Sequence, residues 1–360
     1  MWFAVLAVLS TVILFWQKVT FPKESDNYKR SYSIIIPARN EENNLKRLLP
    51  SLLSADSPGR EIIVVDDHSE DLTMKTAEAY GVKVISNPPL PEGWMGKSWA
   101  CYNGAKQANG KALFFVDADT WFSPGGDLSI INELYKKGKG ALITVHPYHY
   151  MNSFWEKLSA VFHLVVFASS GITAMIRKKE GFQGGFGPCL AIHTETYWKL
   201  DGHRSISDEI VEHLAFTKHA QSRGMLTSAF SGRNAVNMRM YEADLKAVIN
   251  GWSKSFASGA KTASLGMTGV NIVWITLVLS FLINIESTGW WGFVGYGLLA
   301  LWLYRTWKQI GNFRWYDGLL FPLYFFFFVL VFIYSLLKTF FIKETMWKGR
   351  QIVRKRRESS

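Results

Sequence analysis

The eight residues from 112 to 119 read Ala-Leu-Phe-Phe-Val-Asp-Ala-Asp. The apolar first part is typical of a strand that is buried on both faces of a parallel sheet. The two carboxylates that follow, Asp117 and Asp119, can converge on one hard cation such as Mg²⁺ or Mn²⁺. In open α/β sheets, ligands bind at the carboxyl ends of the strands. The stretch therefore predicts an α/β fold with an acidic ligand site at one edge of its sheet.

Other apolar runs alternate with polar, helix-like stretches over residues 31–260, which predicts a parallel sheet covered by helices on both faces, an α/β domain of nucleotide-binding type. The additional runs lie at residues 32–36, 61–65, 82–85 and 141–145. The run at 61–65 ends in Asp66 and Asp67. These carboxylates either accept hydrogen bonds from a base or a ribose, or cap the helix that follows.

The chain has 360 residues, of which 48% are hydrophobic and 19% charged. This composition excludes a disordered chain, a collagen and a small disulfide scaffold. The net charge of +11 favours anionic partners such as acidic lipid, a phosphorylated substrate or nucleic acid. The two cysteines, Cys101 and Cys189, are far apart in the sequence. Their spacing predicts neither a disulfide framework nor a zinc cage. The low cysteine content also predicts that the polar part of the chain lies in a reducing compartment.

Long apolar segments occur near both ends of the chain. Residues 1–17 precede basic residues, which predicts an uncleaved transmembrane signal anchor with the following domain in the cytoplasm. Residues 268–342 contain three apolar runs, and the basic tail at 343–360 favours the cytoplasmic side. Three crossings would place that tail outside, so we expect that one run does not cross completely. The shortest run, 290–304, is the first candidate, and Pro322 offers a break in the last run.

Two internal segments allow more than one interpretation. Residues 154–176 are apolar but interrupted by charged and small residues, which predicts either a helix at the membrane interface or a buried core helix. His146 and His149 flank Pro147, which breaks any helix between them, so packing or acceptor-site lining is favoured over metal ligation. The glycine-rich residues 181–188 lack the context of a dinucleotide fingerprint and predict a mobile loop.

Several ordered segments resemble the family 2 glycosyltransferases, enzymes of GT-A fold that transfer a sugar from a nucleotide diphosphate sugar with inversion. These segments are 34–42, 96–102, 115–119, 147–149, 186–188, 202–205, 251–252 and 347–351. Within that family the chain resembles the membrane-bound glucosyltransferases of apocarotenoid acids. The resemblance implies a GT-A domain over residues 31–260, a divalent metal cofactor, a UDP-sugar donor and a lipophilic acceptor.

The resemblance also implies roles for individual residues. Lys97 would face the diphosphate, and Asp66 or Asp67 would bind the uracil. Asp117 and Asp119 would take the metal and ribose site, with Asp119 as the direct metal ligand. The residues that would line the nucleotide pocket are Pro37, Ala38, Arg39 and Glu41.

The position of the catalytic base departs from the common family pattern, in which a Glu-Asp pair precedes a glycine. Here the pair reads Glu212-His213 before Gly224. By resemblance Glu212 inherits the role of base, and Asp208 and Glu209 are the alternatives.

A second departure lies at residues 251–254, which read Gly-Trp-Ser-Lys where processive relatives carry a Gln-x-x-Arg-Trp motif. The missing Gln-x-x-Arg part argues against polymer synthesis. By resemblance Trp252 and Lys254 would lie on the acceptor or diphosphate side. A tryptophan here is also suited to anchoring an interfacial helix.

These features predict a multi-pass membrane enzyme that transfers a sugar, expected to be glucose, to an apocarotenoid carboxylic acid in carotenoid biosynthesis. A carboxylic acid is already ionised near neutral pH, so it would tolerate a weakened base motif. The alternative acceptors are a hopanoid, a diacylglycerol or a polyprenyl phosphate. A non-catalytic membrane scaffold is the alternative from another class, and the intact Lys97, Asp117 and Asp119 argue against it. Basic residues gather beside apolar segments, so we expect membrane lipids rather than nucleic acid as partners.

Overall fold

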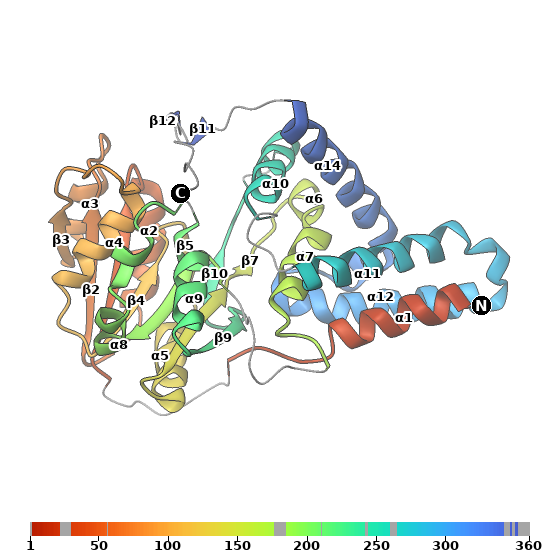
Figure 1. Cartoon of the computed structure of the whole chain (residues 1–360), viewed down its shortest axis with the longest axis horizontal. Helices are drawn as coiled ribbons and strands as arrows, with labels where there is room; N and C mark the ends of the chain where they lie inside the picture. The colour runs from red at the N-terminus through yellow and green to blue at the C-terminus, as the bar shows by residue number, and fades with distance from the viewer. Residues whose placement is uncertain are drawn as a thin grey trace, which may run out of the picture.

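A computed structural model describes most of the chain in two adjoining parts. The described residues are 2–21, 30–55, 57–175, 185–209, 211–241, 244–259, 265–341, 346–347 and 350–351. Figure 1 shows a sheet flanked by helices and, beside it, a group of long helices that includes α1 (Trp2–Leu14). Segments from both ends of the sequence therefore build the helical part.

The main sheet confirms the strands that the sequence predicts. Within the described residues it has seven strands in the order β3-β2-β1-β4-β8-β6-β9. The predicted strands are β1 (Tyr32–Ala38), β2 (Arg60–Asp66), β3 (Lys83–Ser86), β4 (Ala112–Val116) and β6 (Ala141–His146). β1 pairs in parallel with β2 on one side and with β4 on the other. The carboxyl ends of these three strands therefore meet at one edge.

The sheet is mixed, which corrects the prediction of a purely parallel one. β8 (Cys189–His193) lies between β4 and β6 and pairs antiparallel with both. The chain leaves the sheet at the end of β6 and returns at the same edge, where Cys189 pairs with Val116, so β8 must run in the opposite direction. β9 (Leu226–Ser231) completes the sheet parallel to β6.

A second sheet of three short strands leads from the acidic edge toward the helical part. Its order is β5 (Thr120–Phe122), β10 (Val236–Met238) and β7 (Tyr148–His149). Met238 pairs with Thr120 on one side and with His149 on the other. His149 in turn pairs with Gly311, just after helix α12. The turn that carries Asp119 is therefore connected through backbone pairing to the long helices.

Two apolar layers hold helices against the two faces of the main sheet. Ile34 and Ile35 are both fully buried, one in each layer, which is why the strand sequence is continuously apolar. One layer includes α2 (Glu42–Leu53), α3 (Thr73–Ala79) and α5 (Gly126–Lys137). The other includes α4 (Gly96–Lys106), α8 (Thr194–Lys199), the 3₁₀ helix Gly202–Ile206 and α9 (Glu212–Ser222).

The helical part packs around an aromatic core. Its helices besides α1 are α6 (Phe154–Lys157), α7 (Ala160–Ser170), α10 (Leu245–Gly259), α11 (Leu265–Ile283), α12 (Trp290–Ile310), α13 (Trp315–Leu319) and α14 (Phe321–Phe341). The predicted helix at 154–176 is two helices, of which α7 lies in the core, whereas Phe154 and Trp155 of α6 are exposed. Phe162 and Phe167 of α7 are fully buried, and α7 contacts α11, α12 and α14.

Two of the described helices are long and apolar enough to cross a membrane, through the stretches Gly266–Ile283 and Phe321–Lys338. The predicted run at 290–304 forms part of α12, which does not meet that test of composition. α1 has 13 residues and is about 20 Å long, shorter than the roughly 30 Å hydrocarbon core of a bilayer. It packs on α11 and α12. Most of the predicted tail at 343–360 lies outside the described residues.

Candidate active site

The polar residues that follow β1, β2 and β4 lie together at one edge of the main sheet. Ala38 at the end of β1 pairs with Asp66 at the end of β2. β4 runs parallel on the other side of β1 and ends directly before Asp117. The structure therefore brings the residues predicted for the nucleotide pocket next to the acidic pair.

The two aspartates after β2 have different surroundings. Asp66 is buried, and its Oδ1 has no hydrogen-bond partner among the described residues. Asn87 Nδ2 donates to Asp67 Oδ1 at 2.8 Å, and Arg39 Nη1 lies 3.8 Å from Asp67 Oδ2. A Cβ at Gly96, the first residue of α4, would lie 2.9 Å from Asp67 Oδ2, so the glycine lets α4 approach this carboxylate. Asp67 is thus fixed in place, whereas Asp66 keeps a buried acceptor atom.

The loop after β1 is fixed by contacts to α3 and α2. Pro37 and Ala38 belong to the strand itself. The backbone N–H of Glu41 donates to Thr73 Oγ1 at 2.8 Å, and the Glu41 carboxylate accepts from Asn44 Nδ2 at 2.6 Å. The predicted lining of the nucleotide pocket is therefore held by hydrogen bonds before any donor binds.

Lys97 of α4 lies at the centre of the site, between two carboxylates. Its Nζ is 2.6 Å from Asp117 Oδ1 and 2.6 Å from Glu212 Oε1, where Glu212 begins α9. Such charge-assisted contacts are among the stronger hydrogen bonds in proteins. Asp119 is close enough to Asp117 to interact with it, so three carboxylates and one ammonium lie in this region. The remaining negative charge suits a divalent cation.

The pKa values of the two carboxylates beside Lys97 are shifted in opposite directions. Burial, opposed by Lys97 and reinforced by Asp119 and Glu212, raises the pKa of Asp117 to about 7. Burial would raise the pKa of Glu212 as well, but the Lys97 ammonium outweighs it and lowers that pKa to about 2. Lys97 is paired equally closely with both carboxylates, and a further positive charge beside Asp117 would offset its repulsion from Asp119 and Glu212.

Asp117 and Asp119 stand on the turn that joins β4 to β5, and their chemistry fits a divalent metal. The backbone N–H of Asp117 donates to the Pro188 carbonyl at 2.9 Å, and Arg47 Nη2 donates to the Asp119 carbonyl at 3.3 Å. Carboxylate oxygens are the hard ligands that Mg²⁺ and Mn²⁺ prefer. Both side chains are only partly buried, so a bound ion would stay accessible to a diphosphate.

The three carboxylates considered for the base differ in burial. Glu212 is 6% exposed and lies at the N-terminus of α9, where the helix dipole favours a carboxylate. Asp208 and Glu209 are exposed. His213, in the position of the usual Asp, contacts the Gly187 carbonyl through Nδ1, and burial lowers its pKa to about 4. The structure thus places Glu212 beside Lys97 with a neutral imidazole next to it.

Trp252 is a packing residue between α10 and α7. It is 4% exposed, donates to Ser159 Oγ at 2.9 Å and stacks on Phe162 with 4.7 Å between ring centroids. The indole is therefore buried between helices and does not face an open acceptor site. The side chain of Lys254 and the glycine-rich residues 181–184 lie outside the described part of the chain.

One residue beside this region escapes prediction from the sequence. His163 of α7 lies next to His146 and His149, although the spacing of the last two gives no hint of it. The available signal is a histidine inside an otherwise apolar helix.

Comparison with known proteins defines the class. Residues 33–201 match the family model "Glycosyl transferase family 2". A relative from Staphylococcus haemolyticus (strain JCSC1435) is 31% identical over 340 residues, which cover 91% of this chain and 90% of the relative. The chain therefore belongs to glycosyl transferase family 2 and is a glycosyltransferase.

That relative is a 4,4'-diaponeurosporenoate glycosyltransferase. A protein of the same name from Staphylococcus aureus (strain USA300) is 30% identical over 331 residues, covering 89% of this chain and 88% of its own. Among solved structures, the mannosyltransferase PcManGT from Pyrobaculum calidifontis, in complex with GDP-Man and Mn²⁺, superposes with a TM-score of 0.52 and 15% identity. The match covers 95% of this chain and 100% of the mannosyltransferase, and it shows the shared GT-A fold.

Proposed function

We propose that this glycosyltransferase transfers glucose from UDP-glucose, with inversion, to the carboxylate of an apocarotenoid acid in carotenoid biosynthesis. The observation that carries the proposal is the pairing of Lys97 with both Asp117 and Glu212 at the carboxyl edge of the sheet. In this arrangement Lys97 supplies a cation for a diphosphate, and Glu212, paired with that cation, is only a weak base for the acceptor. The relatives named for 4,4'-diaponeurosporenoate support a carboxylate acceptor.

The donor would lie across the strand ends. Arg39 and the aspartates Asp66 and Asp67 would contact the nucleoside, and Lys97 would contact the diphosphate. Asp117 and Asp119 would hold Mg²⁺ or Mn²⁺, which would offset negative charge on the diphosphate. PcManGT, of the same fold, was solved with a nucleotide diphosphate sugar and Mn²⁺.

The acceptor chemistry follows from the weak base. Lys97 holds Glu212 as an ionised carboxylate with a pKa of about 2, so this residue has little tendency to take a proton. A hydroxyl group of a hopanoid or a diacylglycerol would have to lose a proton as the new bond forms. A carboxylate arrives without that proton and needs only orientation toward the anomeric carbon. The site therefore favours an anionic acceptor.

A lipophilic acceptor requires access to a bilayer, and we propose that α11 and α14 cross the membrane with the sheet domain in the cytoplasm. Large apolar side chains point outward from these helices and from α12, including Ile272 at 58%, Phe293 at 76% and Phe326 at 61% exposure. An apolar surface of this kind marks contact with lipid or another apolar partner. The basic residues that follow α14 in the sequence agree with a cytoplasmic end.

The test uses the full chain in detergent, supplied with UDP-glucose and a mixture of an apocarotenoid acid, a hopanoid, a diacylglycerol and a polyprenyl phosphate. We expect mass spectrometry to find a hexose on the apocarotenoid acid, released by mild alkali because the product is an ester. Glycosylation of a hydroxyl lipid or of the polyprenyl phosphate in preference to the acid would overturn the acceptor assignment. UDP-galactose and GDP-mannose serve as competing donors.

A further inference from the structure

Three buried histidines meet where the sheet domain joins the helical part. His146 ends β6, His149 ends β7 and His163 belongs to α7. Their ring centroids are 4.8 Å apart for the first pair, 5.4 Å for His146 and His163, and 4.0 Å for His149 and His163. One ring nitrogen of each lies within 4.8 Å of the corresponding nitrogens of the other two.

The ring nitrogens of this cluster have unused lone pairs. The Nδ1 of His146 is 3.0 Å from the Pro147 carbonyl, to which it donates, so its Nε2 carries a lone pair. The Nδ1 atoms of His149 and His163 are buried and have no hydrogen-bond partner among the described residues. Buried polar atoms without partners are uncommon and call for an explanation such as an ion.

The protonation state suits metal binding. Burial lowers the pKa of His146 to about 3 and holds the pKa values of His149 and His163 well below the usual range. All three imidazoles are therefore neutral near pH 7, which is the form that ligates metals. No proton has to be displaced before an ion binds.

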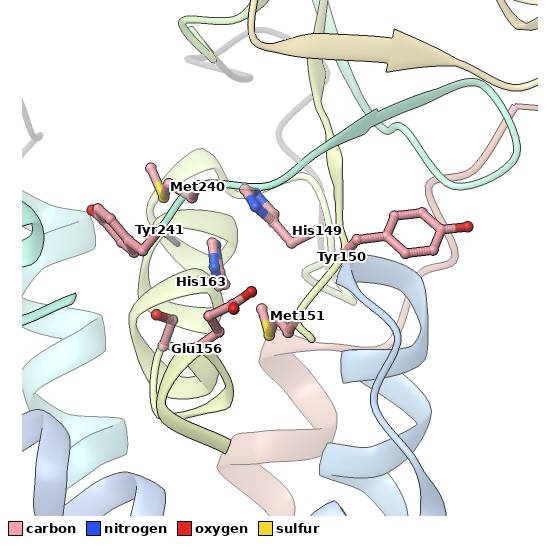
Figure 2. Close-up of a pocket in the computed structure, with 8 residues that line it drawn as sticks. His149, Tyr150, Met151, Glu156, His163, Met240 and Tyr241 are labelled. Carbon is pink, nitrogen blue, oxygen red and sulfur yellow. The ribbon is translucent and has the colours of Figure 1, made fainter. Parts of the chain in front are cut away.

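The surroundings of the cluster match those of a supported ligand set. His149 and His163 line a pocket that also contains Glu156, as Figure 2 shows. Glu156 is buried, and its carboxylate is 2.8 Å from Arg239 Nη2. The Trp252 ring packs edge-on against His163 with 5.1 Å between centroids. This edge-on aromatic packing restricts the orientation of the His163 ring.

We propose that His146, His149 and His163 bind one Zn²⁺ ion, separate from the carboxylate site for Mg²⁺ or Mn²⁺. Imidazole nitrogens select zinc over the hard cations that carboxylates prefer. In tetrahedral geometry two nitrogens about 2.0–2.1 Å from zinc are roughly 3.3 Å apart. The ring nitrogens lie within 4.8 Å of one another, so binding would draw the three rings together by up to about 1.5 Å. A bound ion would link β6 and β7 to α7 and so fasten the sheet domain to the helical part.

The test measures zinc rather than sugar transfer, so its outcome is independent of the proposed function. The full chain in detergent is treated with a chelator, supplied with Zn²⁺, passed through gel filtration and analysed by mass spectrometry for bound metal. Asp119→Ala removes the carboxylate site, His163→Gln removes one imidazole, and His193→Gln is the matched control. His193 lies in β8, at the opposite end of the sheet from the catalytic edge.

We expect about one zinc per chain in the wild type, in Asp119→Ala and in His193→Gln, and zinc affinity at least about 10- to 100-fold weaker in His163→Gln. Co²⁺ in Asp119→Ala should give the visible absorption bands of tetrahedral cobalt. Equal zinc in His163→Gln and the wild type, or loss of zinc in Asp119→Ala alone, would overturn the proposal. If His163→Gln does not fold, the cobalt spectrum of Asp119→Ala decides, because a folded protein without these bands has no such site.

Discussion

The Nζ of Lys97 lies 2.6 Å from Oε1 of Glu212, although the two residues belong to different helices, α4 and α9. The same ammonium is 2.6 Å from Asp117. A cation shared by two carboxylates is held in one position without needing a ligand. The diphosphate of the proposed donor would therefore meet an ammonium that is already in place, which is the preorganisation that favours charge development in a transition state.

Replacing Lys97 with Met should lower kcat/KM for the nucleotide sugar by roughly 10²- to 10³-fold, the usual cost of losing one preorganised charged donor. Both kcat and the donor KM should change, since the ammonium is expected to contact the diphosphate in both states. Steady-state kinetics with varied donor measure this. Lys106→Met, at the other end of α4 and over the ring of Tyr102, is the control and should retain wild-type kinetics. Wild-type constants in Lys97→Met would contradict the diphosphate role.

Asp119→Ala should reduce turnover by about 10³-fold or more, because we propose this carboxylate as a metal ligand. The melting temperature should stay unchanged, because the side chain is only partly buried. Excess chelator should have the same effect on the wild type, reversed by Mg²⁺ or Mn²⁺. Asp201→Asn, at an exposed turn, is the control. Full activity in excess chelator would rule out the metal assignment.

Glu212→Gln separates the two kinds of acceptor. With a hydroxyl lipid as acceptor, loss of Glu212 should lower turnover by at most roughly 10², the low end of general-base catalysis, because Lys97 makes this carboxylate a weak base. With a carboxylate acceptor the loss should be much smaller because no proton has to leave. Turnover of both acceptors by one preparation gives the comparison. Asp208→Asn and Glu209→Gln alter exposed side chains and should leave both rates unchanged. A large loss in either of these variants, with none in Glu212→Gln, would move the base to that residue.

Asp127→Ala should destabilise the sheet domain by about 3–5 kcal/mol, because it leaves a buried charge without its partner. Asp127 Oδ2 accepts from Arg60 Nη1 at 2.9 Å and from the Tyr32 hydroxyl at 2.6 Å, and the Arg60 side chain is only 8% exposed. Denaturant unfolding measures the loss. Glu195→Gln breaks an exposed pair with Lys139 and should be indistinguishable from the wild type. Equal stability of the two variants would contradict the buried ion pair.

A reporter fused after residue 360 should be active on the cytoplasmic side, because the Lys- and Arg-rich end of the chain resists translocation. The prediction requires an even number of crossings after residue 261, as two spanning helices provide. A reporter accessible from outside intact cells would mean that α12 crosses as well.

The polar residues at the strand ends could be predicted from the sequence. The contacts that their side chains make with other elements could not. Asp66 and Asp117 follow apolar runs whose length and composition indicate strands, and parallel strands bring their ends together. The direction of β8 depends on the edge at which the chain re-enters the sheet. The sequence of β8 itself does not predict that edge. The meeting of Lys97 with Glu212 depends on how two helices pack on one face of the sheet.

The same limit applies to the helical part. Apolar content alone cannot separate an interfacial helix from a buried one, since both bury apolar side chains. α7 is buried because α11 and α14 pack against it. Both helices lie far from α7 in the sequence, so its own residues do not reveal this burial. His163 joins His146 and His149 for the same reason, through an arrangement that is not visible in any single segment.

The packing of α1 against the last helices has a consequence for the order of assembly during synthesis. The indole of Trp274 donates to Thr11 Oγ1 at 2.9 Å across 263 positions of the chain, and Arg305 donates to the Phe15 carbonyl. At 5–20 residues per second, the partners of α1 leave the ribosome about 13–50 s after it does. The sheet domain is complete within that interval. The contacts that bury α1 therefore form only after every strand of the main sheet has been synthesised.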